Sequence, residues 1–284
     1  MKNRTLFTLI IILFSSCETV VQVDLIDRSN NLVVESYLEF SDETNSGTAR
    51  VLLSLSSPFY DEINPTYVSN ATVTINDTYT LIEHPDSLGY YVSESPIPYL
   101  GEEEFSLDII ADIEGKEGHW NAKDNFTTVP PIDSIYSIYL PASPPFAEEG
   151  YYCKIIVKDK AFEQNFYHLN VNVNDSLSFS LNGGTKRSSI LRDDLFDGKE
   201  IDIEVNNDPL KVGNTLNVVL SSISEEVYLY YFNLYTLLTE TSGIGAAPPF
   251  PLTSNLVSLN DNFDNALGSF QVRSTTTREI IIEE

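Results

Sequence analysis

Apolar and polar residues alternate along most of this chain. In residues 167–173, Tyr167, Leu169 and Val171 occupy every second position and mostly polar residues lie between them. A period of two places these apolar side chains on one face of a β-strand. The same alternation occurs, between turn residues, at 51–55, 73–75, 107–109, 177–181, 201–205 and 216–220. Since strands do not alternate with helical segments, the pattern predicts an all-β protein.

One segment has the period of a helix instead. Ser222 is followed three residues later by Glu225, which is typical of a capping box at a helix start. Apolar residues then follow at helical spacing, at positions 227, 231, 234 and 238. We therefore expect one helix near 224–240. Because the segment is apolar nearly all round, the helix should be largely buried against a sheet.

A pair of prolines, Pro130 and Pro131, interrupts the strand series. Prolines remove backbone donors and hold the chain extended, which is typical of an inter-domain connection. We expect an immunoglobulin-like β-sandwich in residues 17–130. Residues 131–284 should form a second β-rich domain, which carries the helix.

The first residues have the pattern of a bacterial export signal. Basic residues precede an apolar run over 6–14, too short for a transmembrane helix, and two serines then precede Cys17. This ending resembles the lipobox of bacterial lipoproteins. The resemblance implies that residues 1–16 are a signal peptide and that Cys17 becomes acylated, and two or more acyl chains anchor a protein stably. The alternative is an ordinary secretory signal with an incidental cysteine.

The chain is strongly acidic, with a formal net charge of −26. Loss of residues 1–16 would remove two basic residues and no acidic ones, which gives −28. Nucleic-acid binding requires clustered Lys and Arg, so this composition argues against it and against electrostatic binding to anionic lipid. With 42% apolar residues the chain has ample material for a core. If Cys17 carries lipid, Cys153 has no disulfide partner, and its place in a strand predicts a buried thiol.

Two acidic segments are candidates for calcium binding. One contains Asp193, Asp194 and Asp197, and the other contains Asp261 and Asp264 among asparagines. Calcium prefers six to eight oxygen ligands, which such segments offer. Neither segment has the spacing of an EF-hand loop. The alternative is that these residues form turns by hydrogen bonding to their own backbone, and it requires no ion.

Two proline-rich segments each contain a phenylalanine, Phe146 and Phe250. Segments without a hydrophobic period are expected to be loops, and long loops often carry function. These phenylalanines either cover the core or form a docking surface for a partner or ligand.

No sequence motif indicates catalysis. His84, His119 and His168 stand apart in the sequence, and none belongs to a zinc-binding helix, a nucleophile elbow or a phosphate-binding loop. We therefore predict that the protein is not an enzyme. The only cofactor that the sequence suggests is calcium.

Several short motifs together resemble a known family. Besides Cys17, they are Leu32-Val33-Val34-Glu35-Ser36-Tyr37-Leu38, Asn70-Ala71-Thr72-Val73, Gly89-Tyr90, Pro131-Ile132-Asp133-Ser134, Asp194-Leu195-Phe196-Asp197-Gly198 and Ala266-Leu267-Gly268-Ser269-Phe270. In this order, over nearly the full length, the chain resembles the domain-of-unknown-function family 4249, lipoproteins of Bacteroidota.

The resemblance implies an outer-membrane lipoprotein that assists a TonB-dependent transporter, whose substrate it does not name. It brings no catalytic residues and leaves open which face of the membrane the protein occupies. The alternative is a structural or adhesive cell-surface module with no transported ligand.

Overall fold

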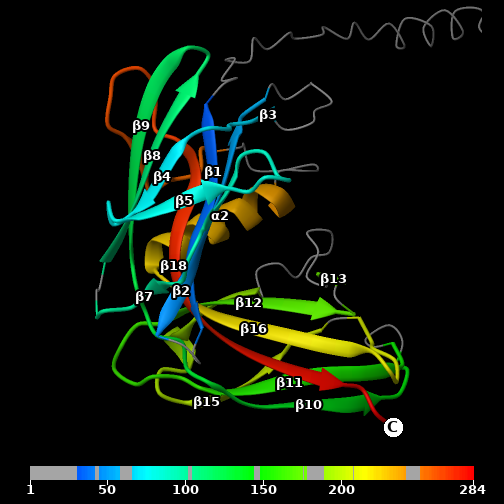
Figure 1. The fold of residues 1–284 in the computed structure, drawn as a ribbon. Coiled ribbons are helices and arrows are strands. Elements are labelled where there is room, and N and C mark those ends of the chain that lie inside the picture. Colours follow the sequence, from blue (N-terminus) through cyan, green and yellow to red (C-terminus); the bar gives the residue numbers. More distant parts are fainter. Residues whose placement is uncertain are drawn as a thin grey trace, which may run out of the picture.

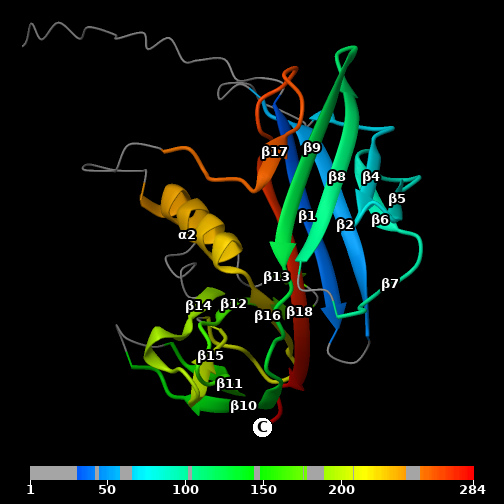
Figure 2. The same ribbon diagram turned by 90° about the vertical axis from the view of Figure 1, so that its left-hand side faces the viewer.

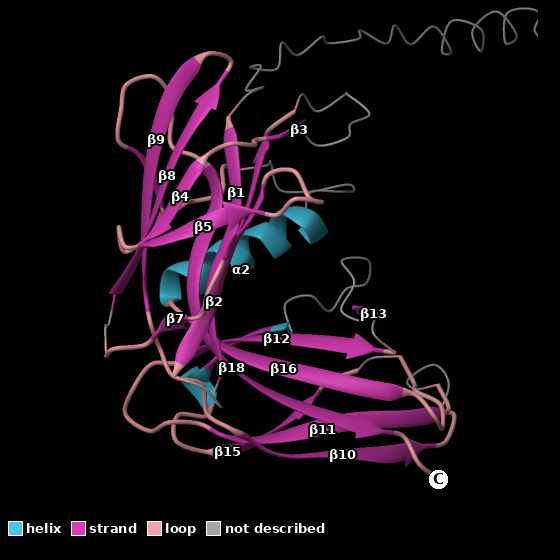
Figure 3. Ribbon diagram, in the orientation of Figure 1, coloured by secondary structure: helices cyan, strands magenta, loops and turns pink. Residues whose placement is uncertain are grey.

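The protein is mostly β-structure, with one long helix (Figure 3). The computed structural model describes residues 31–41, 45–57, 66–101, 104–143, 148–174, 176–177, 189–206, 208–240 and 250–284. The first half contains β1 (Leu32–Ser41), β2 (Ser46–Leu55), β3 (Thr66–Tyr67), β4 (Thr72–Ile75), β5 (Tyr79–Glu83), β6 (Tyr90–Ser93), β7 (Ile97–Pro98), β8 (Glu104–Ile113) and β9 (Lys116–Asn125). The second half contains β10 (Ile132–Leu140), β11 (Gly150–Lys158), β12 (Phe166–Val173), β13 (Ser176–Leu177), β14 (Ile190–Arg192), the 3₁₀ helix η2 (Asp193–Leu195), β15 (Glu200–Glu204), β16 (Thr215–Ile223), α2 (Glu225–Glu240), β17 (Leu256–Ser258) and β18 (Leu267–Ile281). The all-β prediction with one helix is confirmed.

Most of these strands belong to one continuous sheet, in the order β13-β12-β16-β18-β1-β2-β6-β5-β4-β8-β9-β17. β1 and β18 pair in parallel, whereas β1–β2 and β16–β18 are antiparallel. β10, β11 and β15 form a separate three-stranded sheet. The N-terminal end of β1 and the C-terminus lie at opposite ends of the molecule (Figure 1).

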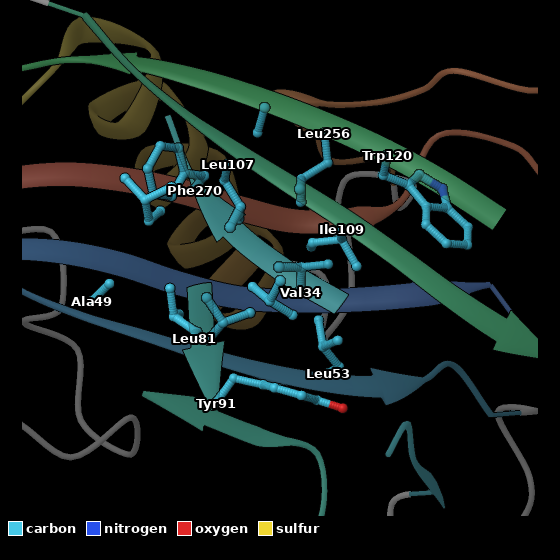
Figure 4. Packing of buried hydrophobic residues seen from close by; sticks show 14 of the residues in the cluster. Val34, Ala49, Leu53, Leu81, Tyr91, Leu107, Ile109, Trp120, Leu256 and Phe270 are labelled. Atoms are coloured by element: carbon cyan, nitrogen blue, oxygen red, sulfur yellow. The ribbon is translucent and has the colours of Figure 1, made fainter. Parts of the chain in front are cut away.

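The first hydrophobic core lies inside the curl of the large sheet. Trp120, Tyr91 and Phe270 are among its largest fully buried side chains, and they come from three different strands (Figure 4). The alternating apolar residues of β2, β4 and β8 point into this core, as the sequence pattern predicts. The two layers expected of an immunoglobulin-like sandwich are thus two sides of one curled sheet.

Polar side chains bridge the gap where the sheet curls back on itself, between β9 and β18. The Asp124 carboxylate of β9 accepts a 2.6 Å hydrogen bond from the backbone N–H of Val272 in β18. Asn255 donates to the carbonyl oxygens of Lys123 and Phe270 and accepts from the Phe270 N–H. These side chains satisfy backbone groups that would otherwise lie unpaired at two sheet edges.

The second core lies between the three-stranded sheet and the far part of the large sheet. β11 contributes Cys153 and Ile155, and the predicted apolar faces of β12 and β16 pack against them. Cys153 is fully buried, which confirms the expected structural thiol. Burial raises the pKa of this thiol to about 11, so it is a weak nucleophile at neutral pH.

The long strand β18 contributes to both cores. Phe270 and Val272 belong to the first core, and Ile280 packs against the second. Pro130 and Pro131 lie between β9 and β10, where the chain passes from one core to the other. The predicted division at residues 130 and 131 stays a prediction, and both cores draw residues from distant parts of the sequence.

The helix α2 lies on the face of the large sheet opposite the cores (Figure 2). It begins at Glu225, two residues later than a cap at Ser222 would place it, because β16 continues to Ile223. Ser224, not Ser222, caps the helix, with its hydroxyl accepting from the N–H of Val227. The helix also leaves Leu229, Phe232 and Leu238 exposed, so it is less buried than its apolar sequence predicts. Among the described residues, no helix is long and apolar enough to cross a membrane.

Asp124 gives the fold a pH dependence that can be measured. Burial raises its pKa to about 6, above the value of about 3.9 in an unfolded chain. The folded protein therefore binds this proton more tightly, and its stability should fall as pH rises from 4.5 to 7.5. Relative to Asp124→Asn, which retains an acceptor for Val272, we expect the wild type to lose about 2 kcal/mol over this interval. Urea unfolding at the two pH values measures the difference, and an equal change in both proteins would contradict it.

Candidate functional site

The structure brings three aspartates together beside the second core. Asp193 and Asp197 come from the predicted calcium segment, and Asp159 follows β11. One carboxylate oxygen from each lies within 4.8 Å of the others, and this is the one group of potential metal ligands found in the described residues. Asp159 and Asp193 are buried, and Asp197 is exposed.

Each of these aspartates also ties two loops together. Asp159 accepts from the Gly198 N–H and the Tyr167 hydroxyl, Asp193 accepts from the Asn165 N–H, and Asp197 accepts from the Phe162 N–H. The loops over 159–165 and 193–199 are therefore held by carboxylate–backbone hydrogen bonds. These hydrogen bonds run from one loop to the other, whereas the turn-forming alternative expects bonds to the aspartates' own backbone.

The electrostatics of this aspartate cluster disfavour full ionisation. Burial raises the pKa of Asp193, and the negative charges of Asp159 and Asp197 raise it further. Two side chains at its margin, Phe162 and Leu195, are 97% and 86% exposed. They lie on the two loops that the aspartates connect, and both are accessible to solvent.

The remaining calcium candidates do not converge. The Asp194 carboxylate forms an ion pair of 2.9 Å with Arg192 and lies outside the cluster. Asp261 and Asp264 line an open hollow near Asn31, and no third ligand-type residue joins them in the described part of the chain. The asparagines of this loop instead hydrogen-bond to Glu117 O, and Trp120 Nε1 donates to Asp264 O. The tryptophan thus anchors the loop.

Calcium binding and loop tying predict different results for Asp197→Asn. The asparagine oxygen would still accept from Phe162, and one repelling charge would be gone. If the cluster only holds the two loops together, we expect this variant to unfold at a slightly higher temperature than the wild type. Its free energy of unfolding should be larger by up to about 1 kcal/mol. Neither protein should then respond to added calcium. A calcium-induced rise in the melting temperature of the wild type and of Asp194→Asn, but not of Asp197→Asn, would establish a calcium site instead.

Other residues singled out by sequence have separate positions. Cys17 and Phe146 lie outside the described residues. Phe250 is partly buried at the start of the segment 250–284. The docking surface predicted for the two phenylalanines therefore stays a prediction.

The three histidines lie on or next to three different strands. His119 faces Asp108 across 3.2 Å on the surface, and His84 lies near the ring of Tyr90. His168 is buried beneath α2, where its ring stacks on Tyr231 at 4.5 Å. The prediction that the protein is not an enzyme stays a prediction.

A pocket that sequence reasoning missed lies between α2 and β18. It has a volume of about 290 Å³, and its lining is Glu226, Val227, Leu229, Tyr230, Thr253, Ser254, Asn255 and Ser269. Burial raises the pKa of the Tyr230 phenol to about 12, and the nearby Tyr231 and Glu35 add to the shift. No local sequence signal marks this pocket, because its walls come from segments that tertiary packing brings together.

One comparison with known proteins identifies a protein family. A family model described as a domain of unknown function (DUF4249) matches residues 18–279, which is nearly the whole chain. No curated protein matches the chain.

Proposed function

Because this chain belongs to the DUF4249 family of unknown function, we propose that it is a lipid-anchored accessory or binding protein of the bacterial outer membrane. In this proposal Cys17 carries the lipid, and the β-structure works beside a TonB-dependent transporter. The family itself assigns no activity, so the proposal depends on residues of this chain.

The observation that carries the proposal is the N-terminal sequence. A basic start, an apolar run and two small residues lead directly to Cys17. The family match begins at residue 18, next to this cysteine.

The arrangement of the fold fits an anchor at this end. β1 begins at Leu32, and the 14 residues between it and Cys17 would span at most about 50 Å. The hollow lined by residues 260–265 lies near Asn31 at the same end, and the second core lies toward the opposite end (Figure 1). The exposed Phe162 and Leu195 belong to that second part, where they would be free of the lipid surface and accessible to a partner.

The anchor and the partner can be tested in the native host. When the tagged protein is purified from detergent-solubilised membranes, a β-barrel transporter should be recovered with it. In cells grown with radiolabelled fatty acid, the tagged protein should carry the label. Cys17→Ala should lose the label, the membrane fractionation and the transporter together. Cys153→Ala, which changes the other cysteine, should retain all three.

Two results would count against the proposal. If Cys17→Ala kept the fatty-acid label and the membrane fractionation of the wild type, Cys17 would not be the lipid anchor. Recovery of no transporter by a correctly anchored wild type, together with normal nutrient uptake and impaired attachment after gene deletion, would favour the structural or adhesive alternative.

A further inference from the structure

The helix α2 packs on the large sheet outside both hydrophobic cores (Figure 2). Its apolar contacts form a third cluster, the helix cluster, whose buried members are Phe166, Ile223 and Val227. Tyr228 and Tyr231 of α2 pack against this cluster. As far as the structure describes the chain, neither core contains a residue of α2, so the packing of the two cores does not depend on the helix.

Two buried polar groups lie on the sheet face beneath α2. Among the described residues, neither His168 Nδ1 nor Ser221 Oγ has a hydrogen-bond partner. The two residues are opposite each other on β12 and β16, so their side chains share the face that the helix covers. A buried polar group without a partner costs free energy, and water would supply partners if the helix moved away. This cost offsets part of the stabilisation that helix packing provides.

The imidazole of His168 contacts α2 directly. Its ring stacks on Tyr231 with the ring centroids 4.5 Å apart, and its Nε2 lies 3.4 Å from the Tyr235 hydroxyl. A charged imidazolium requires hydration that this position does not offer, since His168 is only 6% exposed. Protonation of the ring therefore favours an arrangement in which α2 no longer covers it.

The surroundings of His168 oppose protonation while the helix is in place. Burial and the positive charge of Arg273 lower the pKa of His168 to about 3, whereas an exposed imidazole has a pKa of about 6.5. The Arg273 guanidinium is paired with the Glu39 carboxylate at 2.6 Å. Burial raises the pKa values of Tyr231 and Tyr235, so these phenols are uncharged near neutral pH. The described groups that the packed elements bring to this region are Arg273 and Gln271 of β18, Glu35 and Glu39 of β1, Tyr231 and Tyr235 of α2, Ser221 of β16 and Ile190 of β14.

We infer that α2 is a releasable helix, which detaches from the large sheet while both cores stay folded, and that protonation of His168 favours the released state. Ser224, the one residue between β16 and α2, would act as the hinge. Release would uncover His168 and the aromatic side chains of the helix cluster. This inference goes beyond the proposed function, since it requires neither Cys17 nor a transporter.

Hydrogen exchange of the full-length protein in detergent measures the release. At both pH 7.5 and pH 5.0, backbone amides of α2 should be less protected than those of β1, because release does not require the first core to unfold. Between these pH values, the protection of α2, corrected for the intrinsic exchange rate, should fall about 30-fold. This is the ratio by which protons favour the exposed imidazole. Equal protection of α2 and β1 would show that the helix opens only with the sheet, and the inference would be wrong.

Two variants at His168 test the role of the imidazole. In His168→Phe and His168→Gln, the protection of α2 should change less than about threefold over the same interval, since neither side chain titrates. The glutamine variant keeps a polar group if phenylalanine does not fit. Asp124, whose pKa is about 6 and which hydrogen-bonds to Ser224, titrates in all three proteins, so its contribution cancels in the comparison. A 30-fold fall in either variant would overturn the role of His168.

Val227→Ala tests the attachment of the helix without changing a charge. Loss of this buried contact should lower the protection of α2 by about tenfold or more at both pH values, and β1 should change less than about threefold. Leu229→Ala is the matched control, because Leu229 lies on the same helix and is 44% exposed, and it should change neither. An equal fall in α2 and β1 of Val227→Ala, or no fall in α2, would contradict separate release of the helix.

Discussion

Replacing Gly268 with alanine is expected to destabilise the fold by about 2–6 kcal/mol. Gly268 has a φ of +99°, where an L-residue is strained, and strain of this kind costs about 1–3 kcal/mol. An added Cβ would also lie 1.9 Å from the carbonyl oxygen of Val34. Since β1 and β18 pair at the centre of the sheet, this contact can be relieved only by moving their backbones, which adds about 1–3 kcal/mol.

Gly213→Ala is the matched control for this prediction. Gly213 has a φ of +89°, but no atom lies within 4 Å of an added Cβ. The Gly213→Ala variant therefore has the backbone strain without the collision. We expect its free energy of unfolding to fall by about 1–2 kcal/mol. Urea unfolding monitored by circular dichroism compares the two variants. Equal losses would show that β1 and β18 separate more easily than their central position indicates.

His168 should make the fold sensitive to acid. Burial, with a contribution from the positive charge of Arg273, lowers its pKa to about 3, whereas the unfolded value is about 6.5. Protons therefore bind preferentially to the unfolded chain, and this contribution to stability, complete above pH 6.5, is lost as pH falls toward 3. When the pH is lowered from 7.5 to 4.0, we expect the free energy of unfolding of the wild type to fall by about 3 kcal/mol more than that of His168→Phe.

The surroundings of His168 explain why it does not simply accept the proton. Its Nδ1 is buried without a hydrogen-bond partner among the described residues, and its Nε2 is 3.4 Å from the Tyr235 hydroxyl. Phenylalanine can retain the stacking on Tyr231, and it removes the titration together with the contact to the Tyr235 hydroxyl. Tyr235→Phe is the control, since it removes the hydroxyl and should keep the pH dependence of the wild type. If His168→Phe lost as much stability in acid as the wild type, the imidazole would not be the cause.

The sequence predicted the strands well because a half-buried strand carries its own signal. The alternating residues of β2, β8, β12 and β16 all turned out to face a core. The position of the helix was also correct to about one residue at its start. The choice of Ser222 as its cap was wrong because capping depends on where the preceding strand ends, and the pairing of β16 with β12 extends that strand to Ile223.

The polar faces of the strands were harder to interpret. His168 lies on the polar face of β12, which suggests exposure, yet α2 covers it. Gln271 of β18 likewise exchanges hydrogen bonds with the Tyr231 hydroxyl of α2. The alternation shows which side chains share a face, but it does not show what packs on that face.

The aspartate cluster was half predictable. Asp193 and Asp197 are close in sequence and belong to the predicted calcium segment, which also included Asp194. Asp159 has no local signal, because it joins them only after β11 and β14 have found their partners in different sheets. The pocket between α2 and β18 shares this property, since its lining residues are distant in the sequence.

The sequence by itself determined the β-rich composition, the face of each strand that enters a core, the single helix and the family of the chain. These follow from local periodicity and from motif order, which require no knowledge of partners. Only the tertiary structure decided that β18 pairs in parallel with β1, that α2 covers a polar sheet face, and that both cores share one sheet. Such pairings join residues more than 200 positions apart, and backbone hydrogen bonds, which are the same for nearly every residue, leave the choice of partner to packing.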